Sequence, residues 1–373
     1  MRSTRWVIWM VLPMLVGGLA AAASATGSLA HQAEFDSISC TSTRSCVAVG
    51  FYLGSGGEHT LAEHFNGRSW SMQTTPSPGS APMLTGVSCG SQRFCMAVGN
   101  GSRGTVAELW DGSRWSPSAS QSPSGSTSAL QAVSCPVAGW CMAVGASHNS
   151  QAPLAELYSG GAWTTTPIAP PAGTSFIGLD GISCASETSC LAVGSVTIDR
   201  RYAAIAERYA NGEWTDVPLQ EHGPQPTLSA VSCVGSGYCL AVGDATPQGT
   251  PRGPIAVAFS GTSATVLSPG GGSRAGLYGV SCTQAARCVT TGAASRGNVD
   301  HTYSEALDGT RWQTLQTTDP GVPDALTGGV WCHSAGSCVA AGYYAGQGAQ
   351  TAPLSEVLSG TRWRPVPGTA KQL

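Results

Sequence analysis

Short apolar segments of strand length alternate with clusters of Gly, Ser and Pro along most of the chain. In one stretch these segments are 84–89, 95–99, 106–110 and 114–116. Each is rich in Val, Ala or aromatic residues and is bounded by turn-forming residues, which is typical of β-strands. No segment keeps an apolar period of 3.6 residues, so we expect little helix. The pattern predicts a repeating unit of four short strands.

Seven pairs of cysteines mark seven copies of this unit. The two cysteines of a pair are six positions apart, and the first cysteines of successive pairs are 49, 46, 49, 49, 49 and 50 residues apart. A fixed period of this size indicates a repeat architecture. Four antiparallel strands in each of seven units predict an all-β fold, a seven-bladed β-propeller. The pairs are Cys40 and Cys46, Cys89 and Cys95, Cys135 and Cys141, Cys184 and Cys190, Cys233 and Cys239, Cys282 and Cys288, and Cys332 and Cys338.

Each unit is expected to contain two hairpins. The first and second segments would form one, closed by the C-x5-C disulfide, because paired strands bring Cα atoms within disulfide reach. Zinc sites usually space cysteines more closely and these pairs lack histidine partners, so we predict structural disulfides and no metal or cofactor. The third and fourth segments would meet at a two-residue turn with positive φ at both central positions. The dipeptides that suggest it are Asn66-Gly67, Asp111-Gly112, Asn211-Gly212 and Asp308-Gly309.

The order of the strands within a blade determines which loops share a face. If the first segment is innermost, the cysteine loops and the Asn-Gly turns lie on one face, and loops that vary between units lie on the other. We favour this order because the linkers between units are long enough to cross a blade. The alternative places the cysteine hairpin outermost and lets both ends of the chain close one blade jointly.

Variable loops on a rigid scaffold commonly carry function. Aromatic rings stack on sugars and peptides, and arginine pairs with carboxylates, so such residues on the variable loops are candidates for binding. They are Tyr52, His59, Arg200, Arg201, Tyr202, His301, Tyr343 and Tyr344.

The first residues read as an export signal. Arg2 and Arg5 precede an apolar run from Trp6 to about Ala23, and residues 23–25 form an A-x-A cleavage site. An uncleaved membrane anchor is the alternative. Export to an oxidising compartment agrees with the paired cysteines. The predicted organisation is a signal peptide (1–25), a short N-terminal segment (26–35), a propeller (36–366, repeats starting near 36, 84, 130, 179, 228, 277 and 327) and a C-terminal tail (367–373).

The charge of the chain narrows the class of partner. Without residues 1–25, 16 basic and 21 acidic residues remain, and charged residues are only 10% of the whole chain. The sequence therefore offers no basic patch for a phosphate backbone. We expect a monomer, secreted or associated with the cell envelope, with no nucleic-acid partner and no membrane partner after cleavage.

The units share the pattern V-S-C…C-x-A-V-G…A-E-x-[aromatic]-[ND]-G-x-x-W. This pattern resembles repeats of secreted bacterial β-propellers, loosely similar to kelch and sialidase-type propellers, over residues 36–366. Residues 111–115 lack the spacer between acid and glycine of a sialidase Asp-box, the sialidase arginine motif is absent and the kelch double glycine is not kept. The resemblance implies the fold and transfers no catalytic residue.

A glutamate recurs in the third segment of six units. We expect it to be structural, paired with an arginine across the hairpin or with backbone amides. The fifth unit has Val257 instead and Ala264 near the place of the recurrent tryptophan. The six are Glu63, Glu108, Glu156, Glu207, Glu305 and Glu356.

Three functions remain compatible with these observations. The leading hypothesis is a secreted, non-catalytic propeller that binds a cell-envelope glycan or a protein through one face. The second is an extracellular polysaccharide hydrolase or lyase, which requires a pair of carboxylates near the channel mouth, with Asp199, Asp244 and Asp300 as candidates. The third is a structural cell-surface protein.

Overall fold

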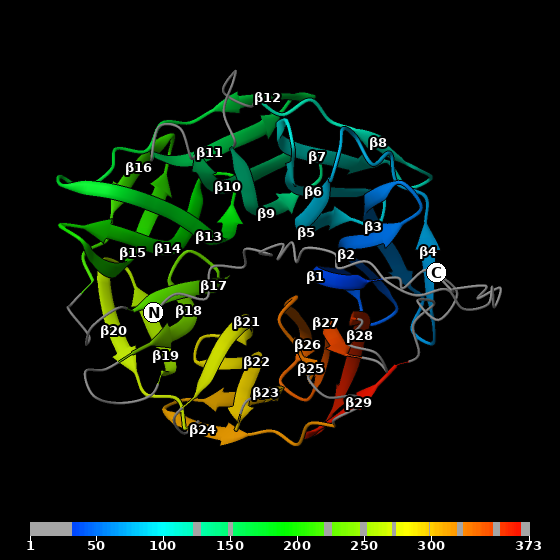
Figure 1. The fold of residues 1–373 in the computed structure, drawn as a ribbon. Helices are drawn as coiled ribbons and strands as arrows, with labels where there is room; N and C mark the ends of the chain where they lie inside the picture. Colours follow the sequence, from blue (N-terminus) through cyan, green and yellow to red (C-terminus); the bar gives the residue numbers. More distant parts are fainter. Residues whose placement is uncertain are drawn as a thin grey trace, which may run out of the picture.

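Seven antiparallel sheets, each formed by one repeat, surround a central channel in the computed structural model (Figure 1). The structure describes residues 32–121, 128–147, 152–219, 226–246, 252–270, 274–297, 299–318, 324–345 and 351–366. The predicted seven-bladed β-propeller, with one C-x5-C disulfide in each blade, is confirmed. In the described part of the chain, no helix is long and apolar enough to span a bilayer.

Each blade uses consecutive strands of the chain. Blade 1 contains β1 (Ala33–Ser42), β2 (Ser45–Gly54), β3 (Gly57–Phe65) and β4 (Trp70–Gln73); blade 2, β5 (Met83–Ser91), β6 (Phe94–Gly101), β7 (Gly104–Trp110) and β8 (Trp115–Pro117); blade 3, β9 (Ala129–Val137), β10 (Trp140–Ser147), β11 (Ala152–Ser159) and β12 (Ala162–Thr165); blade 4, β13 (Thr174–Ser186), β14 (Ser189–Ile198), β15 (Arg201–Ala210) and β16 (Glu213–Asp216). Blade 5 contains β17 (Thr227–Val234), β18 (Tyr238–Ala245), β19 (Gly253–Ser260) and β20 (Ser263–Leu267); blade 6, β21 (Ala275–Gln284), β22 (Arg287–Arg296), β23 (Val299–Asp308) and β24 (Arg311–Thr314); blade 7, β25 (Asp324–Ala325), β26 (Val330–Ser334), β27 (Ser337–Ala345), β28 (Thr351–Ser359) and β29 (Arg362–Pro365).

Each disulfide closes the hairpin between the two inner strands of its blade, as predicted. In six blades the two cysteines are direct cross-strand partners. In blade 3 the register shifts beside the bridge, between Trp140 and Met142. The bridges join Cys40 to Cys46, Cys89 to Cys95, Cys135 to Cys141, Cys184 to Cys190, Cys233 to Cys239, Cys282 to Cys288 and Cys332 to Cys338, with Cα atoms 3.9–4.2 Å apart.

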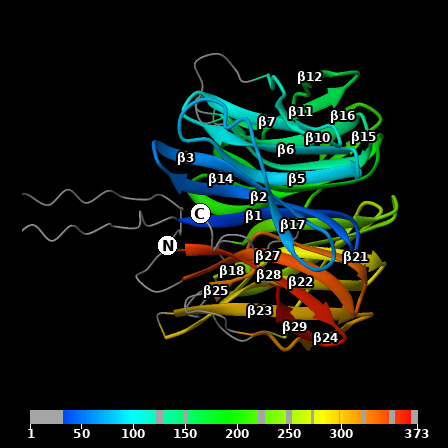
Figure 2. The ribbon, with the colours of Figure 1, turned by 90° about the vertical axis from the view of Figure 1, so that its right-hand side faces the viewer.

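The first strand of each repeat is innermost, as the favoured order predicted. Residues of β1, β5, β9, β13, β17 and β21 line the channel, together with residues 327–330 of blade 7. The strands run between the two faces of the disc, which is seen edge-on in Figure 2. The cysteine hairpins and the outer turns share one face, the disulfide face: the Gly309 amide donates to Ala286 O at 2.8 Å, and the Gly360 amide to Gly336 O at 3.0 Å. The opposite face, the linker face, carries turns such as 55–56 and linkers such as 74–82.

The outer turns differ partly from the prediction. Asn211 and Gly212 both have positive φ, at 51° and 101°, and form the expected two-residue turn. In blade 1 the loop has four residues instead, and Asn66 Oδ1 accepts from the amides of Arg68 and Ser69. Asp111 of blade 2 does the same. In blade 6 the loop is 309–310, one residue later than predicted. The prediction was wrong in these three blades; in blades 1 and 2 the Asx side chain itself satisfies the turn amides.

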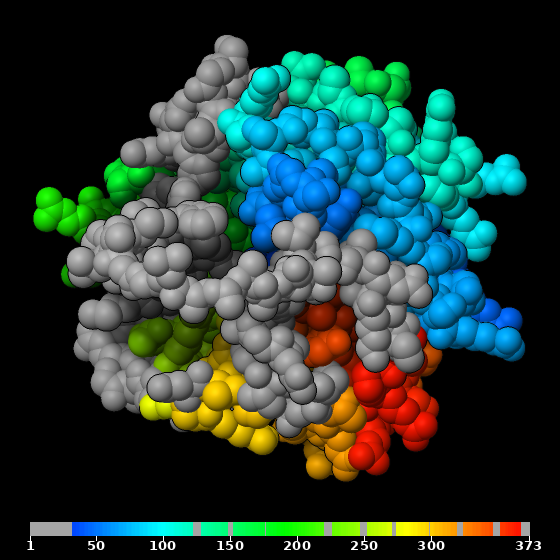
Figure 3. Space-filling view, turned by 45° about the vertical axis from the view of Figure 1, so that its right-hand side comes forward, coloured from blue at the N-terminus to red at the C-terminus, as the bar shows by residue number. Residues whose placement is uncertain are grey.

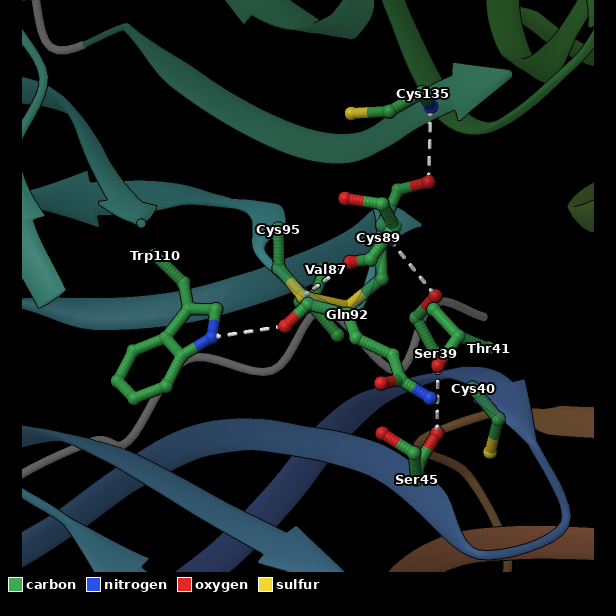
Figure 4. Close-up of a disulfide and its surroundings, with 12 residues drawn as sticks. Ser39, Cys40, Thr41, Ser45, Val87, Cys89, Gln92, Cys95, Trp110 and Cys135 are labelled. Atoms are coloured by element: carbon green, nitrogen blue, oxygen red, sulfur yellow. Dashed lines mark hydrogen bonds between the residues drawn. A yellow bond between two sulfur atoms is a disulfide. The ribbon is translucent and has the colours of Figure 1, made fainter. Parts of the chain in front are cut away.

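A serine hydroxyl joins each of six blades to the next. The serine before the first cysteine accepts a hydrogen bond from the amide of the equivalent cysteine in the following blade, as Ser39 does from Cys89 at 3.0 Å (Figure 4). This contact explains why Ser precedes Cys in the repeat. The other five contacts join Ser88 to Cys135, Ser134 to Cys184, Ser183 to Cys233, Ser232 to Cys282 and Ser281 to Cys332, at 2.9–3.0 Å.

The seam between blades 7 and 1 is held by a different kind of contact. Trp331 occupies the serine position of blade 7 and packs against an apolar cluster that contains Phe35 and Trp70 of blade 1 and Val339 and Ala341 of blade 7. In the space-filling view, the blue surface of blade 1 meets the orange and red surface of blade 7 (Figure 3). Each disulfide lies within its own blade and no cysteine is free. Apolar packing therefore replaces the serine contact where the ring closes.

We expect loss of one serine contact to weaken the ring modestly. Ser183→Ala removes the acceptor of the Cys233 amide and should lower the free energy of unfolding by about 1 kcal/mol. Ser263→Ala, at an exposed position of β20, is the matched control and should change it by less than about 0.5 kcal/mol. Denaturant unfolding of the oxidised chain measures both. Equal midpoints for the two variants would contradict a role of the serine hydroxyl in blade-to-blade packing.

A bulge in the inner strand points one residue of each of blades 1 to 6 toward the channel. In blade 4 the pairing of β13 with β14 skips Asp180, which lies between the paired positions Leu179 and Gly181. The glycine of Ala-Val-Gly lies opposite the bulge: a Cβ built on Gly194 would lie 1.9 Å from Gly178 O. A Cβ built on the equivalent glycine of each of the seven blades would lie 1.9–2.0 Å from a carbonyl oxygen of the inner strand. The repeated glycine thus permits the bulge that shapes the channel wall.

Candidate functional site

The eight predicted binding residues lie toward the linker face, but seven of them are on strands. β2 continues to Gly54 and β3 begins at Gly57, so the variable loop expected around Tyr52 and His59 is mostly a regular hairpin. Only Arg200 lies in a turn, with φ of 65°. The expected loop positions were wrong in blades 1 and 4 because the second and third strands stay paired up to a short turn, as β14 and β15 do as far as Ile198 and Arg201. Whether these eight residues bind a ligand stays a prediction.

The structure separates these residues into three groups. The first, at the seam of blades 7 and 1, contains Tyr52, which stacks on His59 with ring centroids 5.2 Å apart, and Tyr343, which alternation along β27 places on the same side as Val339 and Ala341. The second, at the junction of blades 6 and 7, contains His301 and Tyr344. The third, in blade 4, contains Arg200, Arg201 and Tyr202 and lies elsewhere on the ring (Figure 1).

A cavity of about 470 Å³ lies at the junction of blades 6 and 7. His301 belongs to its wall, and His301 Nδ1 lies 3.9 Å from Oδ1 of Asp324, a fully buried carboxylate at the start of blade 7. The Thr302 hydroxyl donates to Asp324 Oδ2 at 2.9 Å. Asp324 therefore connects two neighbouring residues of β23 to blade 7. The wall is formed by Ala294, Arg296, His301, Thr302, Tyr303, Ser304, Thr314, Leu315, Gln316, Thr317 and Arg362.

Blade 6 is unusually polar inside. Where blades 1 to 5 have Ala-Val and blade 7 has Ala-Ala before the glycine, blade 6 has Thr290 and Thr291, both fully buried. The Thr290 hydroxyl donates to Glu305 O at 3.1 Å, and the buried Ser304 hydroxyl donates to Thr290 O at 2.6 Å. Burial, followed by the neighbouring Glu305 carboxylate, raises the pKa of the Tyr303 phenol. Blade 6 therefore departs from the repeat beside the cavity.

The wall of this cavity suits an anionic group. Its described residues include the guanidinium groups of Arg296 and Arg362, one imidazole, five hydroxyl side chains and one carboxamide, but no Asp or Glu. Arginine binds carboxylates through two parallel hydrogen bonds, whereas the wall hydroxyls of Thr302, Ser304 and Thr317 already donate within the protein. The chemistry available here is therefore recognition of a carboxylate.

The central channel is a second candidate, which the sequence reasoning missed. It encloses about 350 Å³. The residue four positions before the first cysteine of blades 1 to 6 lines it, and Thr327 lines it in blade 7. These residues are all polar, but their identity differs from unit to unit, whereas the rest of the strand repeats closely. A polar position that varies within a repeated strand could have indicated the channel site from the sequence. They are Asp36, Thr85, Gln131, Asp180, Ser229, Tyr278 and Thr327.

A ring of branched aliphatic residues lies two positions further along the chain in blades 1 to 6, and three positions further in blade 7, toward the disulfide face. Each side chain of this aliphatic ring is 5–9% exposed, and all seven line the channel on the disulfide-face side of the polar residues. The ring consists of Ile38, Val87, Val133, Ile182, Val231, Val280 and Val330.

The recurrent glutamates are buried at the contacts between blades. Glu108 Oε1 accepts from the Thr60 hydroxyl of the preceding blade at 3.1 Å. Glu156 Oε2 accepts from the Gln121 amide at 3.1 Å, and Glu356 accepts from the Thr318 hydroxyl; Gln121 and Thr318 lie in the linkers that enter these blades. The expected structural role is confirmed for these three. Their hydrogen bonds reach amide and hydroxyl groups of the preceding repeat, whereas an arginine across the hairpin was the other expectation.

The three aspartates considered for a hydrolase or lyase occupy three different blades. Asp199 lies in a turn of blade 4, with φ of 48°. Asp244 of blade 5 is buried, pairs with Arg252 and accepts from the Thr227 hydroxyl at 3.2 Å. Asp300 of blade 6 accepts from the Ser295 hydroxyl at 2.5 Å. Asp244 and Asp300 are thus held by partners within their own blades.

Comparison with known proteins identifies the fold alone. No protein-family model and no curated protein sequence matches the chain. Two solved propeller structures are similar to it at low sequence identity. The first, described as YCF48 bound to D1 peptide, has a TM-score of 0.57 and 13% identity over 88% of this chain and 92% of that chain. The second, the structure of U3-55K, has a TM-score of 0.50 and 11% identity over 76% of this chain and 80% of that one.

Proposed function

We propose that this protein is an exported binding propeller that holds an acidic segment of a partner protein at the junction of blades 6 and 7. The observation that carries the proposal is the cavity of about 470 Å³, whose wall contains two arginines and no carboxylate among its described residues. A side-chain or C-terminal carboxylate of a peptide would pair with the guanidinium group of Arg296 or Arg362.

Two further observations support a protein partner. The cavity lies where blade 6 departs from the repeat, and a specialised site is expected to alter one blade while the scaffold blades stay alike. A propeller of similar fold has been solved with a peptide bound, so a scaffold of this shape is able to hold a peptide. Recognition of an envelope glycan, the other possibility suggested by the sequence, becomes an outcome of the test.

The test begins with a random-peptide library selected on the purified, oxidised chain. We expect the selected peptides to be enriched in Asp, Glu or a free C-terminus. Arg296→Gln and Arg362→Gln should each weaken the binding of a selected peptide about ten-fold, by fluorescence anisotropy, because each removes a charge-assisted pair. Arg114→Gln, on the disulfide face with a side chain 80% exposed, is the matched control and should bind normally.

Peptides without acidic enrichment, or equal affinities for all three variants, would refute the proposal. A glycan array probed with the same proteins distinguishes the other ligand class. Selective glycan binding that is lost in Arg296→Gln and kept in Arg114→Gln would replace the protein partner with a glycan.

Export is part of the proposal and is supported by the basic and apolar pattern of residues 2–23 and by the seven disulfides. N-terminal sequencing of the protein from its native host should begin at Thr26. An intact Met1 on the exported chain would indicate a retained anchor.

A further inference from the structure

The central channel has the opposite electrostatic character to the cavity between blades 6 and 7. Two of its seven polar residues are aspartates, and its described lining contains no Arg, Lys or His. The remaining five offer hydroxyl groups and one carboxamide. Every one of these groups is able to accept a hydrogen bond, so the wall is complementary to a cation that donates several.

The two carboxylates face the channel from distant points of the ring. Asp36 belongs to blade 1 and Asp180 to blade 4, so two blades separate them on one side and three on the other. A ligand that meets both must extend across the channel.

Of the two carboxylates, Asp180 is the more suitable to hold a cation. No hydrogen bond or ion pair of its carboxylate occurs among the described residues. The side chain is exposed to the channel interior, and residues of all seven blades surround it there. This desolvation raises the pKa of Asp180 to about 7. A cation beside the carboxylate would compensate for the lost solvation.

We propose that the channel binds a linear organic cation, with an ammonium or guanidinium group held at Asp180 and a hydrocarbon stem along the channel. The aliphatic ring below the polar residues offers that stem an apolar wall. The site and the charge of its ligand both differ from those of the proposed peptide site, so this inference does not rest on the proposed function.

A small divalent metal ion fits the channel less well. Calcium requires six to eight oxygen ligands at 2.3–2.6 Å, which means that several carboxylates must converge. Among the residues that the structure describes, no three His, Cys, Asp or Glu side chains come together in this way. Ammonium and guanidinium groups, by contrast, use directional hydrogen bonds to single carboxylates and hydroxyls.

Calorimetric titration with spermidine at pH 8 and low salt tests the proposal on the oxidised chain. The neutral triacetyl derivative of spermidine and calcium chloride are the comparison probes. We expect spermidine to bind, its neutral derivative not to bind, and Asp180→Asn to weaken spermidine binding at least ten-fold. Asp308→Asn makes the same charge change at an exposed position on the disulfide face and should bind normally.

A second variant guards against loss of folding in Asp180→Asn. Gln131→Glu adds a carboxylate to the same polar ring with almost no change of shape and should tighten spermidine binding several-fold. Equal affinities in Asp180→Asn, Gln131→Glu and Asp308→Asn would overturn the proposal. So would equal binding of the neutral derivative, or calcium binding that displaces spermidine in the parent protein and is lost in Asp180→Asn.

Discussion

Replacement of Gly194 by alanine is expected to destabilise the propeller by about 3 kcal/mol or more. The new Cβ would lie 1.9 Å from Gly178 O and 2.8 Å from Leu179 Cα. Both atoms belong to the backbone of the inner strand, so no side-chain rotation relieves the overlap, and the strand itself must move. Overpacking in a dense interior usually costs 1–3 kcal/mol, and a backbone obstacle places this site at the upper end.

The measurement is the thermal unfolding midpoint of the oxidised chain. We expect Gly194→Ala to lower it by at least about 5 °C. Gly237→Ala is the matched control, because a Cβ there meets nothing within 4 Å and the residue does not have positive φ. It should unfold within about 2 °C of the parent. If both variants unfold at the same temperature, the glycine of Ala-Val-Gly does not accommodate the bulge.

The architecture was predictable because each of its determinants recurs seven times. The cysteine spacing defined the unit, and four strand-length segments per unit defined the blade. Pairing of Cys40 with Cys46 followed from the hairpin that encloses them, and the two cysteines are direct cross-strand neighbours with Cα atoms 3.9 Å apart. The turns were less predictable, since Asn66 and Asp111 satisfy backbone amides with their own side chains, and a dipeptide pattern does not reveal this competition.

The candidate sites were predictable only in part. His301 was selected as a loop residue, yet its place beside Asp324 depends on the packing of two blades and not on sequence proximity. The channel residues escaped notice because a bulge reverses the alternation that a regular strand would impose. Asp180 reads as one position in an ordinary strand until the pairing of β13 with β14 shows that it has no partner across the sheet.

The protein is expected to be more stable near pH 5 than near pH 8, because it buries carboxyl groups that resist ionisation. Burial raises the pKa of Glu108 from 4.5 to about 7, against the opposing effect of hydrogen bonds from Thr60 and Ser77. Burial, with a smaller contribution from nearby Asp216, also raises the pKa of Glu207 to about 7, and burial raises that of Glu156.

The direction of the effect follows from proton binding. A carboxyl group with a raised pKa in the folded state retains its proton when the unfolded chain has lost it. Its contribution to stability is therefore fully present below about pH 4.5 and declines as the pH rises toward about 7. For Glu108, which is fully buried, the difference between these two values corresponds to about 3 kcal/mol.

Glu108→Gln should remove this dependence at one site. The glutamine is neutral at every pH, and its Oε1 is able to accept from the Thr60 hydroxyl as the glutamate does at 3.1 Å. We therefore expect the variant to resemble the parent at pH 5 and to exceed its free energy of unfolding at pH 8 by up to about 3 kcal/mol. Glu187→Gln, at an exposed turn, should follow the parent at both values. Denaturant unfolding of all three proteins at pH 5 and pH 8 gives the free energies to compare. If Glu108→Gln is less stable than the parent at pH 8, the buried carboxylate is ionised and is held by stronger donors than Thr60 and Ser77.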